Sequence, residues 1–200
     1  MKRRLLPILM TLVLVCALPI WAAFVTSPDV TNPLLPTADA TELTLQGMID
    51  QANAGDTIKL SSNTEVHATL QITKNLTLDL NGHVLKMTGD GSVLRVEEGP
   101  HPVTLTITDS RPQNPHTGSY ADLPAGGVIT GGKGPNVTGI YYDYVGGAVF
   151  LEKDTTLTLE GGTLTVNSGS SIYIDGATLV MSGGTLNGKT GGVHNNGGHC

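Results

Sequence analysis

The chain has 200 residues, of which 39% are apolar, 14% charged and 4% aromatic, and its formal net charge is −6. So little charge with this much apolar content excludes an intrinsically disordered chain. An acidic balance without basic clusters excludes nucleic acid and anionic lipid surfaces as expected partners. The 26 glycines and the scarcity of aromatic residues favour many short strands joined by tight turns.

The N-terminus has the pattern of a targeting segment. Residues 2–4 are basic and residues 5–25 are almost wholly apolar, as in a signal peptide. An apolar run of roughly 20 residues could also span a bilayer as an uncleaved anchor. We therefore assign residues 1–25 to a signal peptide or N-terminal membrane anchor, and the proline-containing residues 26–43 to a linker. Either way, the sequence predicts a secreted or cell-surface protein that meets a membrane only through this segment.

A short amphipathic helix is expected next, between Thr44 as N-cap and Gly55 as the left-handed residue after its end. Its apolar side chains fall at positions i, i+3, i+4 and i+7, which are Leu45, Met48, Ile49 and Ala52. Such a helix would cover the open apolar end of the strands that follow.

The first strands are predicted at residues 57–60 and 68–72. Residues 73–85 then contain two strands hinged at Asn81-Gly82. Asn-Gly is also a strong signal for a local antiparallel hairpin. We favour a corner between two sheets, because Gly-Gly pairs occupy the same place in the later repeats.

Residues 146–196 nearly repeat themselves. Leu157 and Leu179 are 22 residues apart, as are Leu164 and Leu186. A fixed period of this length, built from short alternating runs and Gly-Gly pairs, is typical of a stacked repeat. A third copy begins at residue 191 and stops at Cys200, so we expect residues 44–200 to form one domain that is incomplete, and prone to fray, at its C-terminal end.

The alternating runs also predict which faces are buried. Leucines on one face would form an inner column: Leu78, Leu105, Leu157 and Leu179. Threonines on the other face would form an outer column: Thr77, Thr104, Thr156 and Thr178.

Residues 45–198 resemble secreted bacterial proteins of the pectin-lyase-like type, in particular adhesin-like surface members. The resemblance is carried by the helix followed by GDTIKL (55–60), by NLTLDLNGHVL (75–85), and by the units GGAVFLEKDTTLTLEGGTL (146–164) and GSSIYIDGATLVMSGGTL (169–186). It implies an all-β fold, a right-handed parallel β-helix of about five or six coils with a short N-terminal capping α-helix. That fold hosts lyases, hydrolases and adhesins, so the resemblance says little about activity.

Two segments, residues 111–125 and 131–145, break the period, and insertions in a solenoid become loops on its side. They contain the residues that we expect to bind ligand: Tyr120, Asp122, Tyr141, Tyr142, Asp143 and Tyr144. Aromatic faces beside short polar groups suit sugar rings, so carbohydrate is the expected partner, with another surface protein as the alternative. The competing interpretation is that the tyrosines fix their own loops to the helix side.

Asp109 and Arg111 lie at a strand end that enters the first insertion. The resemblance makes them the candidate catalytic pair, since lyases of this type hold calcium with carboxylates and abstract a proton with a basic residue. The alternative for Asp109 is a corner residue that bonds its own backbone. No convergent set of acid, base and metal ligands is visible, so catalysis is not expected.

Metal sites are not expected either. Residues 131–139 match a calcium-binding nonapeptide only once, whereas such sites need successive copies, so we expect no cofactor, calcium included. His194, His199 and Cys200 could be metal ligands, but an arbitrary chain end explains them as well. The sequence thus favours a non-catalytic exported or cell-surface protein that presents loops to glycans or host surfaces; the alternative is a polysaccharide lyase or glycoside hydrolase acting on acidic polysaccharide.

Overall fold

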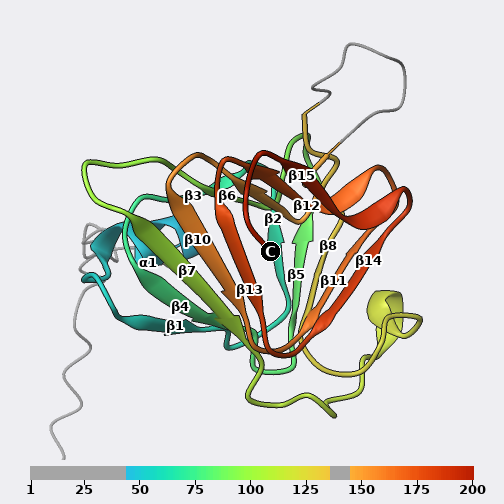
Figure 1. Ribbon diagram of the computed structural model, residues 1–200. Coiled ribbons are helices and arrows are strands. Elements are labelled where there is room, and N and C mark those ends of the chain that lie inside the picture. The colour runs from blue at the N-terminus through green and yellow to red at the C-terminus, as the bar shows by residue number, and fades with distance from the viewer. Residues whose placement is uncertain (1–43, 136–144) are drawn as a thin grey trace, which may run out of the picture. The chain divides into compact units, whose positions relative to one another are not determined.

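The computed structural model describes residues 44–135 and 145–200, which form a parallel β-helix preceded by one short helix (Figure 1). The helix α1 spans Leu45–Gln51, and the strands are β1 Thr57–Lys59, β2 Thr64–Val66, β3 Leu70–Ile72, β4 Leu76–Asp79, β5 Val84–Met87, β6 Leu94–Val96, β7 Val103–Thr108, β8 Val128–Thr130, β9 Val149–Leu151, β10 Thr155–Leu159, β11 Thr163–Val166, β12 Ser170–Asp175, β13 Thr178–Met181, β14 Thr185–Gly188 and β15 Gly191–Asn196.

The strands are distributed over three parallel sheets, and every third strand returns to the same sheet. Sheet A has the order β1-β4-β7-β10-β13, sheet B the order β14-β11-β8-β5-β2, and sheet C the order β15-β12-β9-β6-β3. Each group of three strands is therefore one coil, and successive coils stack in register. The predicted parallel β-helix with an N-terminal capping helix is confirmed.

The helix α1 begins as expected and ends early. The Thr44 hydroxyl accepts a hydrogen bond from the Gly47 N–H at 3.1 Å, which makes Thr44 the N-cap. The helix ends at Gln51, so the prediction that Gly55 follows its last turn was wrong, although Gly55 does have a positive φ of 91°. The cause is the Asp56 carboxylate, which accepts a hydrogen bond from the Asn53 N–H and stabilises a separate turn there.

This helix covers the first coil in two ways. Leu45 and Ile49 are buried in the core, whereas Met48 is exposed. The side chain of Gln46 both donates to the carbonyl of Gln71 and accepts from its N–H. Because β3 is an edge strand, this amide satisfies backbone groups that would otherwise be left open.

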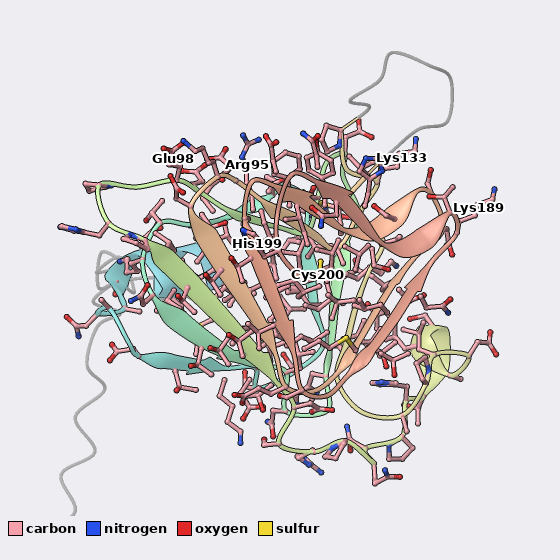
Figure 2. The ribbon with its side chains drawn as sticks, viewed as in Figure 1. Arg95, Glu98, Lys133, Lys189, His199 and Cys200 are labelled. Atoms are coloured by element: carbon pink, nitrogen blue, oxygen red, sulfur yellow. The ribbon has the colours of Figure 1, made fainter. Side chains whose placement is uncertain are left out.

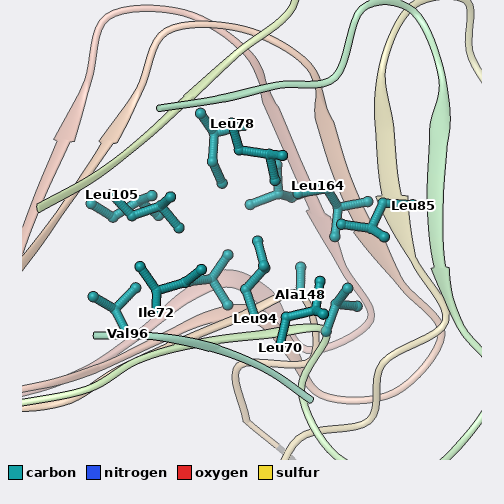
Figure 3. Close-up of a cluster of buried hydrophobic side chains, with 14 of the residues drawn as sticks. Leu70, Ile72, Leu78, Leu85, Leu94, Val96, Leu105, Ala148 and Leu164 are labelled. Carbon is teal, nitrogen blue, oxygen red and sulfur yellow. The ribbon is translucent and has the colours of Figure 1, made fainter. Parts of the chain in front are cut away.

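The interior is a single apolar core to which all three sheets contribute (Figure 3). In sheet A the buried column runs through Leu76, Leu105, Leu157 and Leu179. The predicted column placed Leu78 opposite Leu105, but Leu78 faces Ile107, so that part of the prediction was wrong by two residues. The same shift puts Thr77 opposite Thr106 rather than Thr104. The 22-residue pairings of the later coils are confirmed.

The hinge at Asn81-Gly82 is a corner. Asn81 and Gly82 both have positive φ, 49° and 71°, and they connect β4 in sheet A to β5 in sheet B, so the hairpin alternative is excluded. The strand β2 was missed in the sequence. It has three half-buried or exposed residues and no apolar alternation, and it pairs only with β5.

The first insertion joins β7 to β8 and includes a 3-10 turn at Gly118–Tyr120. Part of the second insertion, residues 136–144, lies outside the described residues, as do residues 1–43 with the expected targeting segment and linker. At the other end, Thr178 and His199 form a parallel bridge, so the last residues begin to pair with sheet A again. Within the described ranges, no helix is both long and apolar enough to cross a membrane.

Candidate functional site at the corner between sheets A and B

The corner after sheet A brings together segments that are distant in sequence. The chain leaves β4 through Leu80, β7 through Asp109 and β10 through Glu160 before it enters sheet B. Because the sheets are parallel and in register, these exits stack on one side of the coil. The candidate catalytic residues and the base of the first insertion both lie here.

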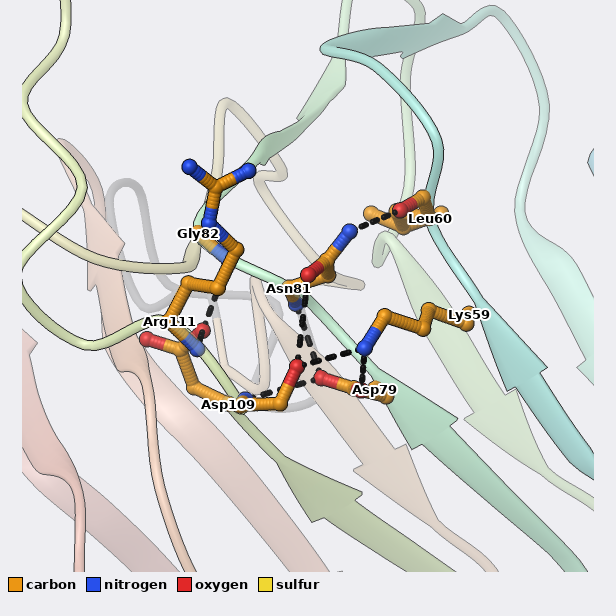
Figure 4. A network of polar contacts seen from close by, with 8 residues as sticks. Lys59, Leu60, Asp79, Asn81, Gly82, Asp109 and Arg111 are labelled. Carbon is orange, nitrogen blue, oxygen red and sulfur yellow. Dashed lines mark hydrogen bonds and ion pairs between the residues drawn. The ribbon is translucent and has the colours of Figure 1, made fainter.

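The carboxylate of Asp109 is held by three backbone N–H groups, of which those of Gly82 and Arg111 belong to residues labelled in Figure 4. Its Oδ1 accepts from Gly82 at 2.7 Å and from Arg111 at 3.2 Å, and its Oδ2 accepts from Gly127 at 2.6 Å. These bonds tie two successive coils and both ends of the first insertion together. A carboxylate used in this way stabilises the corner. Only the bond from Arg111 is the local backbone bond that the alternative interpretation of Asp109 expected, and the two shorter bonds come from distant segments.

A second carboxylate, Asp79, lies beside it and is also fully engaged. Its Oδ1 accepts from the N–H groups of Asn81 and Ser110 at 2.8 and 2.9 Å, and its Oδ2 pairs with the Lys59 ammonium at 3.1 Å. Burial by itself would raise the pKa of the Asp79 carboxyl, but the hydrogen bonds from Ser110, Asn81 and Lys59 outweigh it, and the pKa lies below its ordinary value. The carboxyl is therefore kept ionised.

Arg111 is exposed and does not complete an acid–base pair with Asp109. The two residues meet only through the Arg111 backbone N–H. The Arg111 guanidinium bonds weakly to the Asn114 side chain, at 3.4 Å, and extends away from the Lys59–Asp79 pair in Figure 4.

The first insertion is attached to the outer face of sheet B through Tyr120. The Tyr120 hydroxyl donates to Glu65 Oε1 at 2.8 Å, and the Lys86 ammonium pairs with the same oxygen at 3.1 Å while lying 5.6 Å from the centre of the tyrosine ring. The hydrogen bond from Tyr120, followed by the hydrogen bond and charge of Lys86, lowers the pKa of the Glu65 carboxyl. Burial, followed by the bond to Glu65, raises the pKa of the Tyr120 hydroxyl. This tyrosine thus fixes its own loop.

The other predicted ligand-binding residues are not gathered around Tyr120. Asp122 is exposed in the turn that follows. The remaining four, Tyr141, Tyr142, Asp143 and Tyr144, lie outside the described residues.

An open polar groove of about 370 Å³ runs along this corner. One side of the groove is lined by Asp109, Pro112 and Ala125. The other side is lined by residues of the next two coils at the same corner: Glu160, Gly161, Gly162, Thr163, Gly184 and Thr185. The floor is backbone, because Gly162 and Gly184 adopt the positive φ values that the corner requires, 83° and 80°. A Cβ on Gly162 would lie 2.6 Å from Leu80 Cδ1, and one on Gly184 would lie 2.9 Å from the Gly162 carbonyl oxygen, so a side chain at either position would clash with the stack and strain the turn.

Glu160 is the residue of this groove that sequence reasoning missed. Its side chain is exposed and makes no hydrogen bond or ion pair with any other described residue. In the sequence, Glu160 directly precedes the Gly-Gly pair of a repeat. The repeat itself accounts for this pair, so no local pattern marks Glu160 as a binding residue. Together with the hydroxyl groups of Thr163 and Thr185, it offers hydrogen-bonding groups above an unobstructed floor.

A larger, mostly apolar hollow of about 500 Å³ lies beside α1, where Met48, Val66 and Leu70 line the end of the stack. It belongs to the part of the first coil that α1 leaves uncovered. It contains neither candidate catalytic residue, and we do not consider it the functional site.

The C-terminal residues that could have bound metal point to different neighbours. The His194 ring packs on Tyr173 with centroids 5.3 Å apart, and Cys200 Sγ lies 3.7 Å from the Asn195 amide nitrogen. Figure 2 shows His199 and Cys200 at the end of the last coil. Within residues 44–135 and 145–200, no three histidine, cysteine, aspartate or glutamate side chains are grouped as metal ligands.

Comparison of the chain with protein families, with characterised proteins and with solved structures finds no match.

Proposed function

We propose that the protein is a non-catalytic exported or cell-surface β-helix protein of the pectin-lyase-like type, which binds carbohydrate in the groove at the corner between sheets A and B. The observation that carries the proposal is the free carboxylate of Glu160 beside Thr163 and Thr185, over a floor of glycine backbone. Export is supported by the basic and then apolar N-terminus of the sequence.

Carbohydrate suits this groove because sugar hydroxyl groups need acceptors and donors at short spacing. A carboxylate accepts from two adjacent hydroxyls, and threonine hydroxyls both donate and accept. The chain is acidic, with a net charge of −6, and the groove itself contains Asp109 and Glu160. We therefore expect neutral or amino sugars rather than acidic polysaccharide, which the groove would repel.

The absence of catalysis is supported by the way the candidate pair is used. Asp109 is engaged by three backbone N–H groups, and Arg111 meets it only through the backbone. A general acid or base must reach the substrate proton, and neither side chain is directed toward the other.

The test is binding of neutral, amino-sugar and uronic oligosaccharides on a glycan array, followed by calorimetry with the best ligand. A hydrogen bond to a charged group contributes about 1.5–3 kcal/mol, so Glu160→Gln should weaken binding by roughly 10- to 100-fold. The matched control is Glu98→Gln, an exposed glutamate in the loop that follows β6 in sheet C.

Equal affinities for the wild type and Glu160→Gln would overturn the proposed site. Calcium-dependent release of unsaturated sugars from pectin, lost in both Asp109→Ala and Arg111→Ala, would overturn the non-catalytic assignment in favour of a lyase.

A further inference from the structure

The outer face of sheet A carries an ordered array of threonines, which we name the threonine face. Its members point outward from five neighbouring strands: Thr57, Thr77, Thr104, Thr106, Thr156, Thr158 and Thr178. Figure 1 shows these strands, β1, β4, β7, β10 and β13, side by side along one side of the coil.

The array is aligned in two directions. One column runs from Thr57 through Thr77 and Thr106 to Thr158, and each of these is the direct register partner of the next. A second column, two residues earlier along each strand, contains Thr104, Thr156 and Thr178. Neighbouring strands in a sheet are about 4.7–4.9 Å apart, and alternate residues of a parallel strand are about 6.6 Å apart, so the threonine positions form a lattice of about these dimensions.

The hydroxyls of the threonine face are unused and preorganised. None of the seven is hydrogen-bonded to another residue of the described ranges. Threonine is β-branched and restricted at χ1, so little side-chain entropy is lost when the hydroxyl is fixed by a ligand.

The threonine face is also uncharged. The charged residues of sheet A's outer side, Lys59, Asp79 and Glu160, lie in the next column, at the corner where the strands end. The three positions that complete the two columns are Gly55, Asn75 and Val180, which are neutral as well. A charged partner would make no ion pairs with such a surface. An uncharged hydrogen-bonding partner can bind there without burying an unpaired charge.

A partner that matches this surface must repeat in two dimensions. A soluble glycan chain repeats along one direction and commonly stacks on aromatic rings. The described rings of the strands, Phe150 and Tyr173, lie on sheet C. Crystalline ice is an uncharged hydrogen-bonding lattice whose oxygen rows are spaced on the scale of the strand and residue repeats.

We propose that the threonine face binds a plane of ice, a function beyond carbohydrate binding in the corner groove. Each threonine hydroxyl either replaces one water molecule of the ice lattice or donates a hydrogen bond to a water molecule in it. The threonine methyl groups fill the spaces between the lattice waters. A single hydroxyl contributes little net free energy, so binding depends on several bonds forming at once, which the rigid register of five strands permits.

The test measures how the full chain partitions between slowly growing ice and the remaining liquid, together with its inhibition of ice recrystallisation. The wild type should be enriched in the ice. The double variant Thr106→Lys/Thr158→Lys places two charges in the middle of the lattice and should reduce the enrichment at least about tenfold. The control is Thr165→Lys, an outward threonine at an equivalent position in sheet B, which should leave the enrichment unchanged.

The folding of each variant is checked by circular dichroism and thermal unfolding. Thr106→Val/Thr158→Val, which keeps the shape and β-propensity, provides a second test if the lysine variant does not fold. Exclusion of the wild type from ice, or equal enrichment of the wild type and a folded double variant, would overturn the proposal. Threonine-dependent binding to crystalline cellulose or chitin with exclusion from ice would also overturn it. Glycan binding through Glu160 should survive Thr106→Val/Thr158→Val, which places no charge beside Glu160, so the two proposals fail separately.

Discussion

Asp109 Oδ2 lies 2.6 Å from the backbone nitrogen of Gly127, 18 residues later in the chain. Oδ1 of the same carboxylate accepts from Gly82, which belongs to the preceding coil. One side chain therefore closes the first insertion at its base and fixes the distance between two coils.

Replacement of Asp109 by alanine should destabilise the fold by at least about 3 kcal/mol, because it removes two short hydrogen bonds to a charged acceptor and leaves half-buried N–H groups unpaired. Urea unfolding monitored by circular dichroism measures the change. Asp122→Ala is the control; as an exposed loop residue it should change the free energy of unfolding by no more than about 0.5 kcal/mol. Equal midpoints for the two variants would contradict a structural role for Asp109.

The architecture could be predicted from sequence because alternating apolar runs with a fixed period allow few other solutions. The register could not. A shift of two residues keeps every leucine inside and every threonine outside, so the pattern cannot distinguish Leu78 opposite Leu105 from Leu78 opposite Ile107. The sequence places Asp109 at the end of a strand, so its position at a corner could be predicted. Its partners Gly82 and Gly127 are brought to it by the stacking of the coils, and no local sequence pattern identifies them. Glu160 was missed for the same reason.

The free energy of unfolding should decrease as the pH is lowered, and part of this decrease should come from protonation of Asp79. Its pKa is lower in the folded state than the ordinary value of 3.8, so its stabilising contribution is complete above about pH 3.8 and is lost as the pH falls through the folded pKa. Asp79→Asn should therefore be less stable than the wild type by about 2 kcal/mol at pH 7, and the difference should shrink below pH 3.8. Urea unfolding at a series of pH values measures this. A difference that stays constant down to pH 2.5, a value roughly one unit below the ordinary range, would contradict it.

The attachment of the first insertion can be followed through the titration of Glu65. The bond from Tyr120 is the largest cause of its lowered pKa, so Tyr120→Phe should raise that pKa toward 4.5. NMR titration of the Glu65 carboxyl carbon measures the shift. Lys86→Met should raise the pKa as well, whereas Tyr173→Phe, on sheet C, should not change it. An unchanged pKa in Tyr120→Phe would show that the loop is not held there.

Gly127 should tolerate no side chain. A Cβ at this position would lie 2.2 Å from the Cβ of Leu80 and 2.9 Å from its Cδ1. Gly127→Ala should cost at least about 2 kcal/mol, because Leu80 is fully buried and cannot move aside. Gly99→Ala is the matched control: its φ is not positive and its nearest new contact is 3.4 Å, so the unfolding midpoint should stay close to that of the wild type. Similar losses in both variants would point to a general effect of removing glycine rather than to the contact with Leu80.

The coils should differ in stability according to their place in the stack. Leu157 is fully buried in β10, which has a neighbouring strand on each side, whereas Leu186 is partly buried in β14, which pairs only with β11. Leu157→Ala should therefore cost about 2–5 kcal/mol, and Leu186→Ala clearly less. Amide hydrogen exchange should show the same gradient, with the β14 amides exchanging through local opening while the β10 amides exchange only through global unfolding. Equal losses in the two variants together with uniform protection would mean that the last coil is as tightly held as the centre, and that the end of the stack does not fray.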